Sequence, residues 1–487
     1  MRIMSPDIGT LHFIGIGGIG MSGIAALLLS HGYDVQGSDL ADGANVERLR
    51  DVGARIAIGH QENNIRNKDG ELPVAVVISS AVKDDNPELI AARAAKVPVV
   101  RRAEMLAELM RLKTSVAVAG THGKTTTTSM VGQMLDTAGL DPTVVNGGIV
   151  NAYGTNTRFG KSDWMVVEAD ESDGSFIRLP ATVAVVTNMD PEHLDHYGSF
   201  DNVRNAYRRF ILNLPFHGYA LLCIDHPEVQ SLAAQVSDRK VITYGFNPQA
   251  DIRAENIRTQ GGQSVFDVTF AGWLSENGEE LVIRDIPLSM LGEHNVQNSL
   301  VALGVAQQMG VPVATMKDAM ANFGGVKRRF TKTGTFKGVT FIDDYAHHPV
   351  EIEVVLKTAK IAAEEKQGRV IAVMQPHRYS RLHDLFEEFC RCFNQADHVM
   401  VADVYEAGES PIEGASKEAL VEGLKSHGHR AAFALESKES LAQDLLDVIG
   451  DGDIVVLMGA GDITHWANAL PKEIEAFFEL KRKGQAA

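Results

Sequence analysis

The stretch AVAGTHGKTTTT, residues 117–128, joins an apolar strand pattern to a helix pattern that ends at Gly139. A phosphate-binding loop usually reads G-x-x-x-x-G-K-S/T, and here Val118 stands at the position of its first glycine. The shorter loop still places backbone N–H groups at a helix N-terminus, so we expect it to bind phosphates. Lys124 would bridge the β and γ phosphates, and the Thr125 hydroxyl would bind Mg²⁺. A purely structural Gly-Lys-Thr turn is the alternative.

Length and composition limit the classes of protein to consider. A chain of 487 residues, 45% hydrophobic, has room for about two to four domains, and we expect three. The net charge of -17 argues against nucleic acid as a partner, because phosphate backbones are bound by clustered Lys and Arg. With no signal-peptide pattern and no run of about 18 apolar residues, we expect a cytoplasmic protein that does not enter a membrane. Three cysteines without a CxxC pair are expected to be reduced structural thiols: Cys223, Cys390 and Cys392.

Alternating strand and helix patterns predict an α/β fold. Residues 11–39 form one strand–helix–strand unit, and further strands continue a parallel sheet to about residue 113. A second region begins at Ser115, becomes rich in strands after residue 218 and returns to helix after LGEHNVQN. A third region opens near GGVKRRF. We therefore expect three domains: N-terminal Rossmann-like, 1–113; central P-loop ATPase-type α/β, 114–325; and C-terminal Rossmann-like, 326–487.

A second glycine-rich loop lies in the first strand–helix–strand unit. With an acidic residue after the second strand, it satisfies the full dinucleotide-binding fingerprint: Gly15, Gly17, Gly18, Gly20 and Asp39. Free N–H groups at a helix N-terminus can bind any diphosphate, so the fingerprint is not specific for a dinucleotide. NAD, another diphosphate such as a nucleotide sugar, and a structural turn are all compatible with it. We favour the nucleotide sugar.

Acidic and histidine-rich segments follow two strands of the central region. Glu168, the first residue of EADESD, stands where a strand-end carboxylate could reach Mg²⁺, although the segment could also be a solvated acidic loop. Asn188 opens NMDPEHLDHY, which contains His193 and His196. A zinc pair would need further ligands that the segment does not offer. We favour one histidine in a Mg²⁺ shell or against substrate, with helix capping and packing as the alternative.

Several long motifs together resemble one enzyme family. They are GTHGKTTT, Glu168, NMDPEHLDHY, LGEHNVQN, KRRF, DDYAHHP and PHRYSR, spread between about residues 10 and 465. The chain resembles the Mur ligases of bacterial peptidoglycan synthesis, most closely the branch that joins L-alanine to UDP-N-acetylmuramate. The resemblance implies that the three domains bind, in order, the UDP-sugar, ATP and the amino acid. It also implies the reaction, in which ATP phosphorylates a carboxylate and an amine attacks the acyl phosphate.

The resemblance assigns roles in the first two domains. Thr125 and Glu168 would hold one Mg²⁺, His193 would help to hold a second, and His122 would face the acceptor carboxylate. The remaining loop residues implied to contact ATP are Gly120, Thr121, Gly123, Lys124 and Thr126. The UDP-sugar would be bound by Gly15, Gly17, Gly18, Gly20, Asp39 and Ser80.

Further roles are implied near the third domain. His294 and Asn295 match an adenine-contacting pair, and Arg329 and Asp344 match residues of the ATP site. The side chains implied to grip the amino acid and the acyl phosphate are Tyr345, His347, His348, Arg378 and Arg381. Loop packing is the alternative for the histidine pair, and a basic surface turn is the alternative for PHRYSR. Pro349 should be the first residue of the following helix.

Two positions of the chain depart from the pattern of the family. Several Mur ligases hold Mg²⁺ with a carbamylated lysine, but residues 202–210 contain no lysine, so no carbamate is expected. Ala346 stands where glycine is common in the family, which affects the backbone freedom of the loop that carries it.

Three other functions are alternatives to this ligase. They are a nicotinamide-dependent dehydrogenase, a P-loop switch protein, and the related ligase that attaches a recycled peptide to UDP-N-acetylmuramate. The sequence leaves monomer and homodimer open, as well as the strictness for L-alanine over glycine or L-serine.

Overall fold

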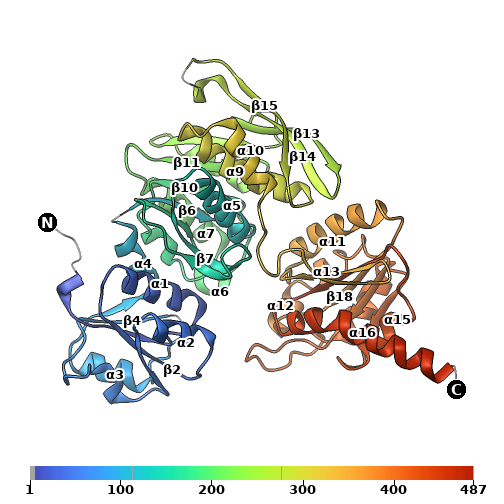
Figure 1. Ribbon diagram of the computed structural model, residues 1–487, viewed down its shortest axis with the longest axis horizontal. Coiled ribbons are helices and arrows are strands. Elements are labelled where there is room, and N and C mark those ends of the chain that lie inside the picture. The colour runs from blue at the N-terminus through green and yellow to red at the C-terminus, as the bar shows by residue number, and fades with distance from the viewer. Residues whose placement is uncertain (1–5, 80, 112, 276, 486–487) are drawn as a thin grey trace. The chain divides into compact units, whose positions relative to one another are not determined.

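The computed structural model describes residues 6–79, 81–111, 113–275 and 277–485 (Figure 1). The chain divides into two compact units. The first comprises Met1–Arg258, Ser264–Ser289 and Asn295–Gly324, and the second comprises Thr259–Gln263, Met290–His294 and Gly325–Ala487. Each unit is described by itself.

The N-terminal part of the first unit contains a parallel five-stranded sheet in the order β3-β2-β1-β4-β5. Its strands are β1 (Leu11–Ile14), β2 (Val35–Asp39), β3 (Arg55–Ile58), β4 (Ala75–Ile78) and β5 (Val99–Arg101). Its helices are η1 (Pro6–Ile8), α1 (Ile19–Ser30), α2 (Ala44–Asp51), η2 (Glu62–Ile65), α3 (Pro87–Ala94) and α4 (Arg102–Met110). The chain leaves β1 towards β2 and returns on the other side at β4, so a ligand-binding crevice is expected at the carboxyl ends of β1 and β4.

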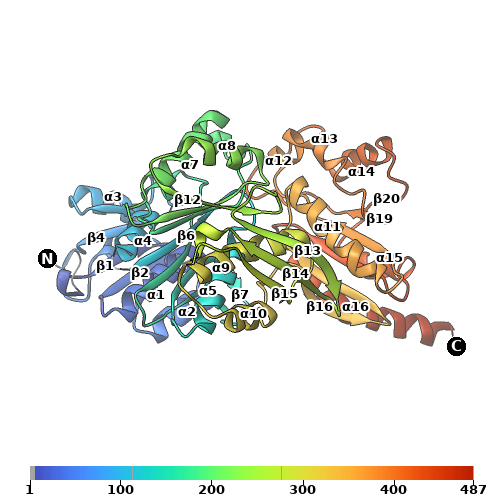
Figure 2. The same cartoon turned by 90° about the horizontal axis from the view of Figure 1, so that it is seen from above.

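The rest of the first unit is built on a ten-stranded sheet in the order β15-β14-β13-β12-β11-β10-β6-β9-β7-β8. Its strands are β6 (Thr114–Ala119), β7 (Thr143–Val150), β8 (Thr155–Arg158), β9 (Trp164–Glu168), β10 (Val183–Val186), β11 (Tyr219–Cys223), β12 (Lys240–Gly245), β13 (Ile252–Gln260), β14 (Gln263–Phe270) and β15 (Leu281–Leu288). Its helices are α5 (Lys124–Thr137), η3 (Ser175–Arg178), α6 (Leu194–Tyr197), α7 (Phe200–Leu212), α8 (Pro227–Gln235), η4 (Gly272–Leu274), α9 (Glu293–Gln308) and α10 (Val313–Ala321). Helix α10 packs against β15 (Figure 2).

The central strand β6 explains why the phosphate-loop stretch decides the fold of this part. It lies between β10 and β9, pairs with both in parallel, and is buried from Ser115 to Ala119. Helix α5 follows the loop directly and ends at Thr137, close to the predicted end at Gly139, which adopts a left-handed conformation. The strand-rich pattern after residue 218 is also confirmed, although α8 interrupts it.

The second unit carries a six-stranded sheet in the order β16-β17-β21-β18-β19-β20, parallel except for β16. Its strands are β16 (Thr331–Phe336), β17 (Val339–Asp344), β18 (Val370–Met374), β19 (His398–Val401), β20 (Ala432–Ala434) and β21 (Ile454–Met458). Its helices are α11 (Pro349–Glu364), α12 (Tyr379–Asp384), α13 (Phe386–Phe389), α14 (Lys417–Ser426), α15 (Leu441–Leu446) and α16 (Ile463–Gln485).

Both faces of this sheet are covered by helices. Val370, Ala372 and Met374 of β18 pack into one apolar cluster with α11, whereas Ile371 and Val373 pack into another with α15 and α16. Figure 1 shows α11 and α16 on opposite sides of β18. A continuous apolar strand such as β18 is what a doubly covered parallel sheet requires.

The structure confirms the expected α/β class, with three separate sheets. The three cysteines are buried and free, in agreement with the expectation of structural thiols. Among the described residues, no helix is long and apolar enough to cross a membrane. The domain limits 113/114 and 325/326 stay a prediction; each sheet lies wholly on one side of them.

Candidate active site

A cavity of about 1020 Å³ lies in the first unit, at the carboxyl ends of β1 and β4. One end is formed by the glycine loop after β1, and the other by Asn146, Gly147 and Glu168 of the central sheet. The cavity thus connects the first glycine loop with the strand-end carboxylate. Its remaining lining residues are Met21, Asp39, Leu40, His60, Ser79, Ala81, Val82, Lys83, Asp85, Asn86, Pro87, Arg102, Leu106, Val145 and Asp170.

The first glycine loop is held in a shape that side chains would disrupt. Gly15 has a φ of +74°, and its N–H donates to the Ser38 carbonyl at 2.8 Å. The Gly17 N–H donates to Asp39 Oδ2 at 2.8 Å, and a Cβ on Gly17 would lie 3.0 Å from the same oxygen. Asp39 therefore supports the loop from within, a role additional to the predicted contact with substrate.

Arg102 is a cationic residue of this cavity that the sequence-based analysis missed. It is the first residue of α4, directly after β5, and a Cβ on Gly20 would lie 3.0 Å from its Nη1 atom. Its Nη2 lies 3.4 Å from Asp170 Oδ2. An arginine beside a glycine loop is suited to bind a diphosphate. The only signal in the sequence was a basic residue after a strand. Ser80, predicted to bind substrate, lies outside the described residues.

The phosphate loop before α5 is closed by glycines that tolerate no side chain. A Cβ on Gly120, whose φ is +133°, would lie 2.0 Å from Thr187 Oγ1. Gly123, with a φ of +81°, is the N-cap of α5, and a Cβ there would lie 2.8 Å from Asn298 Oδ1. These contacts explain how a loop two residues short still turns into the helix. Thr125 and Thr126 are buried in the first turn of α5.

Lys124 is bound by the loop itself and by one carboxylate. Its Nζ donates to the Gly120 carbonyl at 2.6 Å, to the Thr121 carbonyl at 3.1 Å and to Glu171 Oε1 at 2.8 Å. Burial disfavours the ammonium ion, but Glu171 and Glu168 outweigh it and raise the pKa of Lys124. The lysine therefore stays charged, as the neutralisation of a phosphate requires.

Glu171 contradicts the alternative of a solvated acidic loop. Only 3% of its surface is exposed, and its carboxylate is the counter-ion of Lys124. Asp170 pairs with Arg102, and Asp173 accepts a hydrogen bond from the Ser175 N–H at 3.0 Å. The segment after β9 is thus a set of bound carboxylates beside the phosphate loop.

Glu168 and Thr125 are connected through two residues in the middle of β7. The Gly147 N–H donates to Glu168 Oε2 at 2.7 Å, and the neighbouring Asn146 Nδ2 donates to the Thr125 carbonyl at 3.2 Å. Glu168 also lines the cavity. A carboxylate and a hydroxyl oxygen are the kind of protein ligands that Mg²⁺ takes, so these residues fit the ion.

The two histidines of the NMDPEHLDHY segment have different surroundings. His193, with a φ of +55°, places Nε2 3.9 Å from Glu171 Oε1 and 3.7 Å from Glu192 Oε2. The His196 ring instead packs edge-on against Tyr197 at 4.9 Å between centroids. The different surroundings of the two rings favour the prediction that only one of these histidines helps to bind Mg²⁺.

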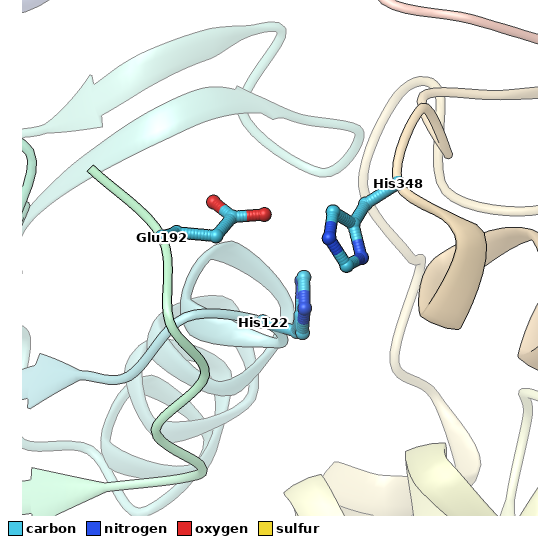
Figure 3. A group of neighbouring side chains, drawn as sticks. All are labelled: His122, Glu192 and His348. Atoms are coloured by element: carbon cyan, nitrogen blue, oxygen red, sulfur yellow. The ribbon is translucent and has the colours of Figure 1, made fainter. Parts of the chain in front are cut away.

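His122 lies inside the phosphate loop, and Glu192 lies on the segment between β10 and α6 (Figure 3). The His122 N–H donates to Asn188 Oδ1 at 2.7 Å, and its carbonyl accepts from Thr187 Oγ1 at 2.7 Å. The segment after β10 therefore fixes the backbone of the loop.

In the second unit, three residues predicted to serve ATP or the amino acid lie close together: Asp344 and Tyr345 at the end of β17, and Arg329 just before β16. Asp344 is buried, accepts the N–H groups of Phe330 and Ala346 at 2.7 and 2.8 Å, and has its pKa raised by burial to about 6. The Arg329 guanidinium lies 5.4 Å from the centre of the Tyr345 ring.

The histidines after β17 are part of the start of α11. His347 Nδ1 lies 2.9 Å from the Tyr345 carbonyl and 3.4 Å from Glu351 Oε2. His348, also drawn in Figure 3, caps α11 in a reciprocal arrangement with Glu351, and Pro349 is the first helical residue as predicted. The packing alternative is therefore correct in part, since His348 has a structural role whatever else it binds.

The PHRYSR segment is a strained turn held by the loop after β19. Arg378 has a φ of +72°, and its N–H donates to the Tyr405 carbonyl at 2.9 Å. The Glu409 carboxylate accepts from the Ser380 N–H at 3.0 Å and from its hydroxyl at 2.8 Å. Strained non-glycine residues are concentrated at functional sites, so this turn favours binding over a simple basic surface turn.

Histidine rings bring together the two segments of this unit that are predicted to bind the amino acid. The His347 and His377 rings are 6.0 Å apart, and His377 stacks on Tyr405 at 5.5 Å. Burial and the neighbouring His347 lower the pKa of His377 to about 4, so it is neutral near pH 7. Arg381 Nη1 lies 3.4 Å from His377 Nδ1. DDYAHHP and PHRYSR thus form one cluster.

The predicted adenine-contacting pair lies at the start of α9. Burial and the charge of Arg329 lower the pKa of His294 to about 4. Asn295 is buried. A neutral imidazole and an amide can both form hydrogen bonds with a base, so these side chains are compatible with the predicted role.

Comparison with known proteins agrees with this architecture. Three family models match in order: the Mur ligase family catalytic domain at 10–114, the Mur ligase middle domain at 118–306, and the Mur ligase glutamate ligase domain at 328–461. The chain belongs to the Mur ligase family. Membership excludes the dehydrogenase and switch-protein readings of the two loops.

Individual Mur ligases match over nearly the whole chain. UDP-N-acetylmuramate–L-alanine ligase of Rhodospirillum centenum is 62% identical over 476 residues, 98% of this chain and 96% of the relative. The Maricaulis maris ligase of the same name is 61% identical over 470 residues, 96% and 98% of the two chains. The crystal structure of UDP-N-acetylmuramate-alanine ligase from Thermotoga maritima has a TM-score of 0.76 at 29% identity, covering 96% of this chain and 99% of its own.

Proposed function

We propose that this Mur ligase joins L-alanine to the carboxylate of UDP-N-acetylmuramate with ATP, through an acyl phosphate. The observation that carries the proposal is the cavity that runs from the first glycine loop to Glu168. A substrate bound there by its diphosphate would present its far end to the phosphate loop. The names of the relatives at about 60% identity agree with this substrate pair.

The first glycine loop would bind the diphosphate of the nucleotide sugar. Its N–H groups at the start of α1 and the guanidinium of Arg102 provide hydrogen-bond donors and positive charge. A volume of about 1020 Å³ is large enough for a nucleotide sugar, since pockets for smaller ligands measure about 300–1,000 Å³. The dinucleotide-binding fingerprint of this loop is thus explained by a nucleotide sugar, without NAD.

The phosphate loop would bind the triphosphate of ATP. Gly120, Thr121, Gly123 and Thr126 surround the start of α5, where Lys124 would neutralise the transferred phosphoryl group. Thr125 and Glu168 would hold one Mg²⁺ and His193 would help to hold a second; when bound, Mg²⁺ offsets the charge that develops on the phosphate oxygens. His122 would face the acceptor carboxylate.

Activation of the carboxylate is the chemical reason for ATP. A carboxylate oxygen attacks the γ-phosphorus, ADP leaves, and the carboxyl carbon now carries a phosphate leaving group. The amine of L-alanine adds to this carbon, loses a proton, and phosphate departs as the amide forms. We assign the adenine to His294 and Asn295, further ATP contacts to Arg329 and Asp344, and the amino acid to Tyr345, His347, His348, Arg378 and Arg381.

Phosphate release tests the proposal. ATP, Mg²⁺ and UDP-N-acetylmuramate are supplied with L-alanine, glycine, L-serine or a murein peptide. We expect release that requires the nucleotide sugar and L-alanine together, with slower release for glycine and L-serine. Lys124→Ala should abolish it, and Lys161→Ala, at an exposed lysine in the bend between β8 and β9, should not. Release with the peptide alone would overturn the assignment of L-alanine and favour the recycling ligase.

A further inference from the structure

Two titratable side chains, Asp190 and His226, lie next to His122 of the phosphate loop and have no role in the proposal above. Asp190 stands between two histidines: its Oδ2 lies 3.4 Å from His122 Nε2, and its Oδ1 lies 3.4 Å from His226 Nε2. His122 comes from the loop after β6, Asp190 follows β10, and His226 is the N-cap of α8. Three separate segments therefore converge on one carboxylate.

The backbone holds Asp190 in register with the loop. Its N–H donates to Thr121 Oγ1 at 2.8 Å, so Asp190 and the residue before His122 are bound to each other directly. Two residues earlier, the Asn188 side chain accepts the His122 N–H at 2.7 Å and donates to the His122 carbonyl at 3.1 Å. Both the backbone and the ring of His122 are thus fixed by the segment after β10.

The charge of Asp190 determines which ring nitrogen of His122 carries a proton. Burial opposes ionisation of the carboxyl, but the two imidazoles outweigh it and lower the pKa of Asp190 well below its usual range. An ionised carboxylate only accepts hydrogen bonds, so its position 3.4 Å from each Nε2 favours the tautomer with the proton on Nε2. In this tautomer Nδ1 of His122 is the unprotonated nitrogen, whose lone pair can accept a hydrogen bond. An aspartate that fixes the tautomer of a catalytic histidine is a general device in enzymes.

We infer that Asp190 and His226 are positioning residues that fix the tautomer and the orientation of His122 during activation of the substrate carboxylate. His226 acts through Asp190, because it occupies the second carboxylate oxygen and prevents the group from turning away. The inference rests on the proposed function for the chemistry that His122 assists. The tautomer itself is a property of the protein without ligands.

A measurement on the ligand-free protein tests the positioning of His122 independently of the proposed ligase function. Histidine is labelled with ¹⁵N, and the ring nitrogens of His122 are assigned from a His122→Gln spectrum. In the wild type we expect the proton on Nε2, and in Asp190→Asn and Asp190→Ala a smaller fraction with the proton there. An unchanged His122 tautomer in both variants would overturn the inference even if ligation proceeds as proposed.

Kinetics then test whether the arrangement serves the reaction. Removal of a supporting side chain of this kind lowers activity by about 10- to 100-fold. We expect Asp190→Asn to lower kcat by at least about tenfold with little change in KM for ATP, and His226→Gln to have a smaller effect in the same direction. In a His122→Ala background the further loss from Asp190→Asn should be less than about twofold, because the residue through which Asp190 acts is gone.

Two variants at surface residues around the same sheet serve as controls. Asp201→Asn alters a carboxylate that pairs with Arg204 on the surface of α7, and His217→Gln alters an exposed histidine before β11. Both should keep the activity of the wild type. Equal losses from Asp190→Asn with and without His122 would overturn the inference, because they would indicate a purely structural effect. If the wild type shows no ligation at all, the proposed function fails while the tautomer measurement still decides the inference.

Discussion

The ion pair between Lys124 and Glu171 should stabilise the phosphate loop of the ligand-free protein. In Glu171→Gln, the lysine loses its counter-ion in a place where both side chains are nearly buried. Removing one partner of a buried ion pair costs about 3–5 kcal/mol, because the other charge is left without compensation. Lys124 keeps the carbonyl oxygens of Gly120 and Thr121, so we expect the lower limit, about 3 kcal/mol.

Thermal unfolding measures this loss directly. For a domain of this size, about 3 kcal/mol corresponds to a decrease in Tm of roughly 6 to 12 °C. Bound nucleotide should remove much of the difference, since a phosphate group gives Lys124 a new counter-ion. At the same saturating concentration of a non-hydrolysable ATP analogue, we expect less than half of the decrease, because the variant that regains a counter-ion binds the analogue more tightly and gains more from it.

Two further variants show whether the effect belongs to the ion pair. Lys124→Met with Glu171→Gln removes both charges and should be more stable than the sum of the single losses predicts. Glu228→Gln breaks the exposed pair with Arg204 and should cost about 0.2–1 kcal/mol, whether nucleotide is present or not. A loss below about 1 kcal/mol for Glu171→Gln, or an equal loss with saturating nucleotide, would refute the reasoning.

Three other substitutions test separate parts of the structure. Gly120→Ala should unfold the loop and abolish ATP binding in calorimetry, because its Cβ has no space, whereas Gly139→Ala, which meets open space, should cost about 1 kcal/mol and leave binding intact. Asp344 binds a proton more tightly in the folded state, with a pKa of about 6 against 3.8, so wild-type stability should fall as pH rises from about 4 to 6. Asp344→Asn lacks this decline, and urea unfolding at pH 4 and pH 7 should show its relative stability improving by about 2 kcal/mol; an unchanged difference would contradict the assignment. Glu409→Ala should loosen the turn that carries Arg378 and raise KM for L-alanine at least about tenfold with KM for ATP unchanged, and a proportional loss for both substrates would argue for general misfolding.

The sequence by itself determined the α/β class, the order of the elements and the family. These features depend on local chemistry, because a glycine turn between an apolar strand and a helix needs specific residues at fixed spacing. The stretch around Gly120 and the helix that ends before Gly139 could therefore be read directly. The end of β17 and the first residue of α11 were predictable for the same reason.

Only the tertiary structure decided which side chains meet. Arg102 was a basic residue after a strand until the fold placed it against Gly20, and Glu171 was one of several acids until its burial paired it with Lys124. Asp190 and His226 come from segments far apart in the chain, and no local pattern connects them. Such contacts depend on how parallel strands are ordered in a sheet, which brings the ends of β6 and β10 together across long stretches of sequence.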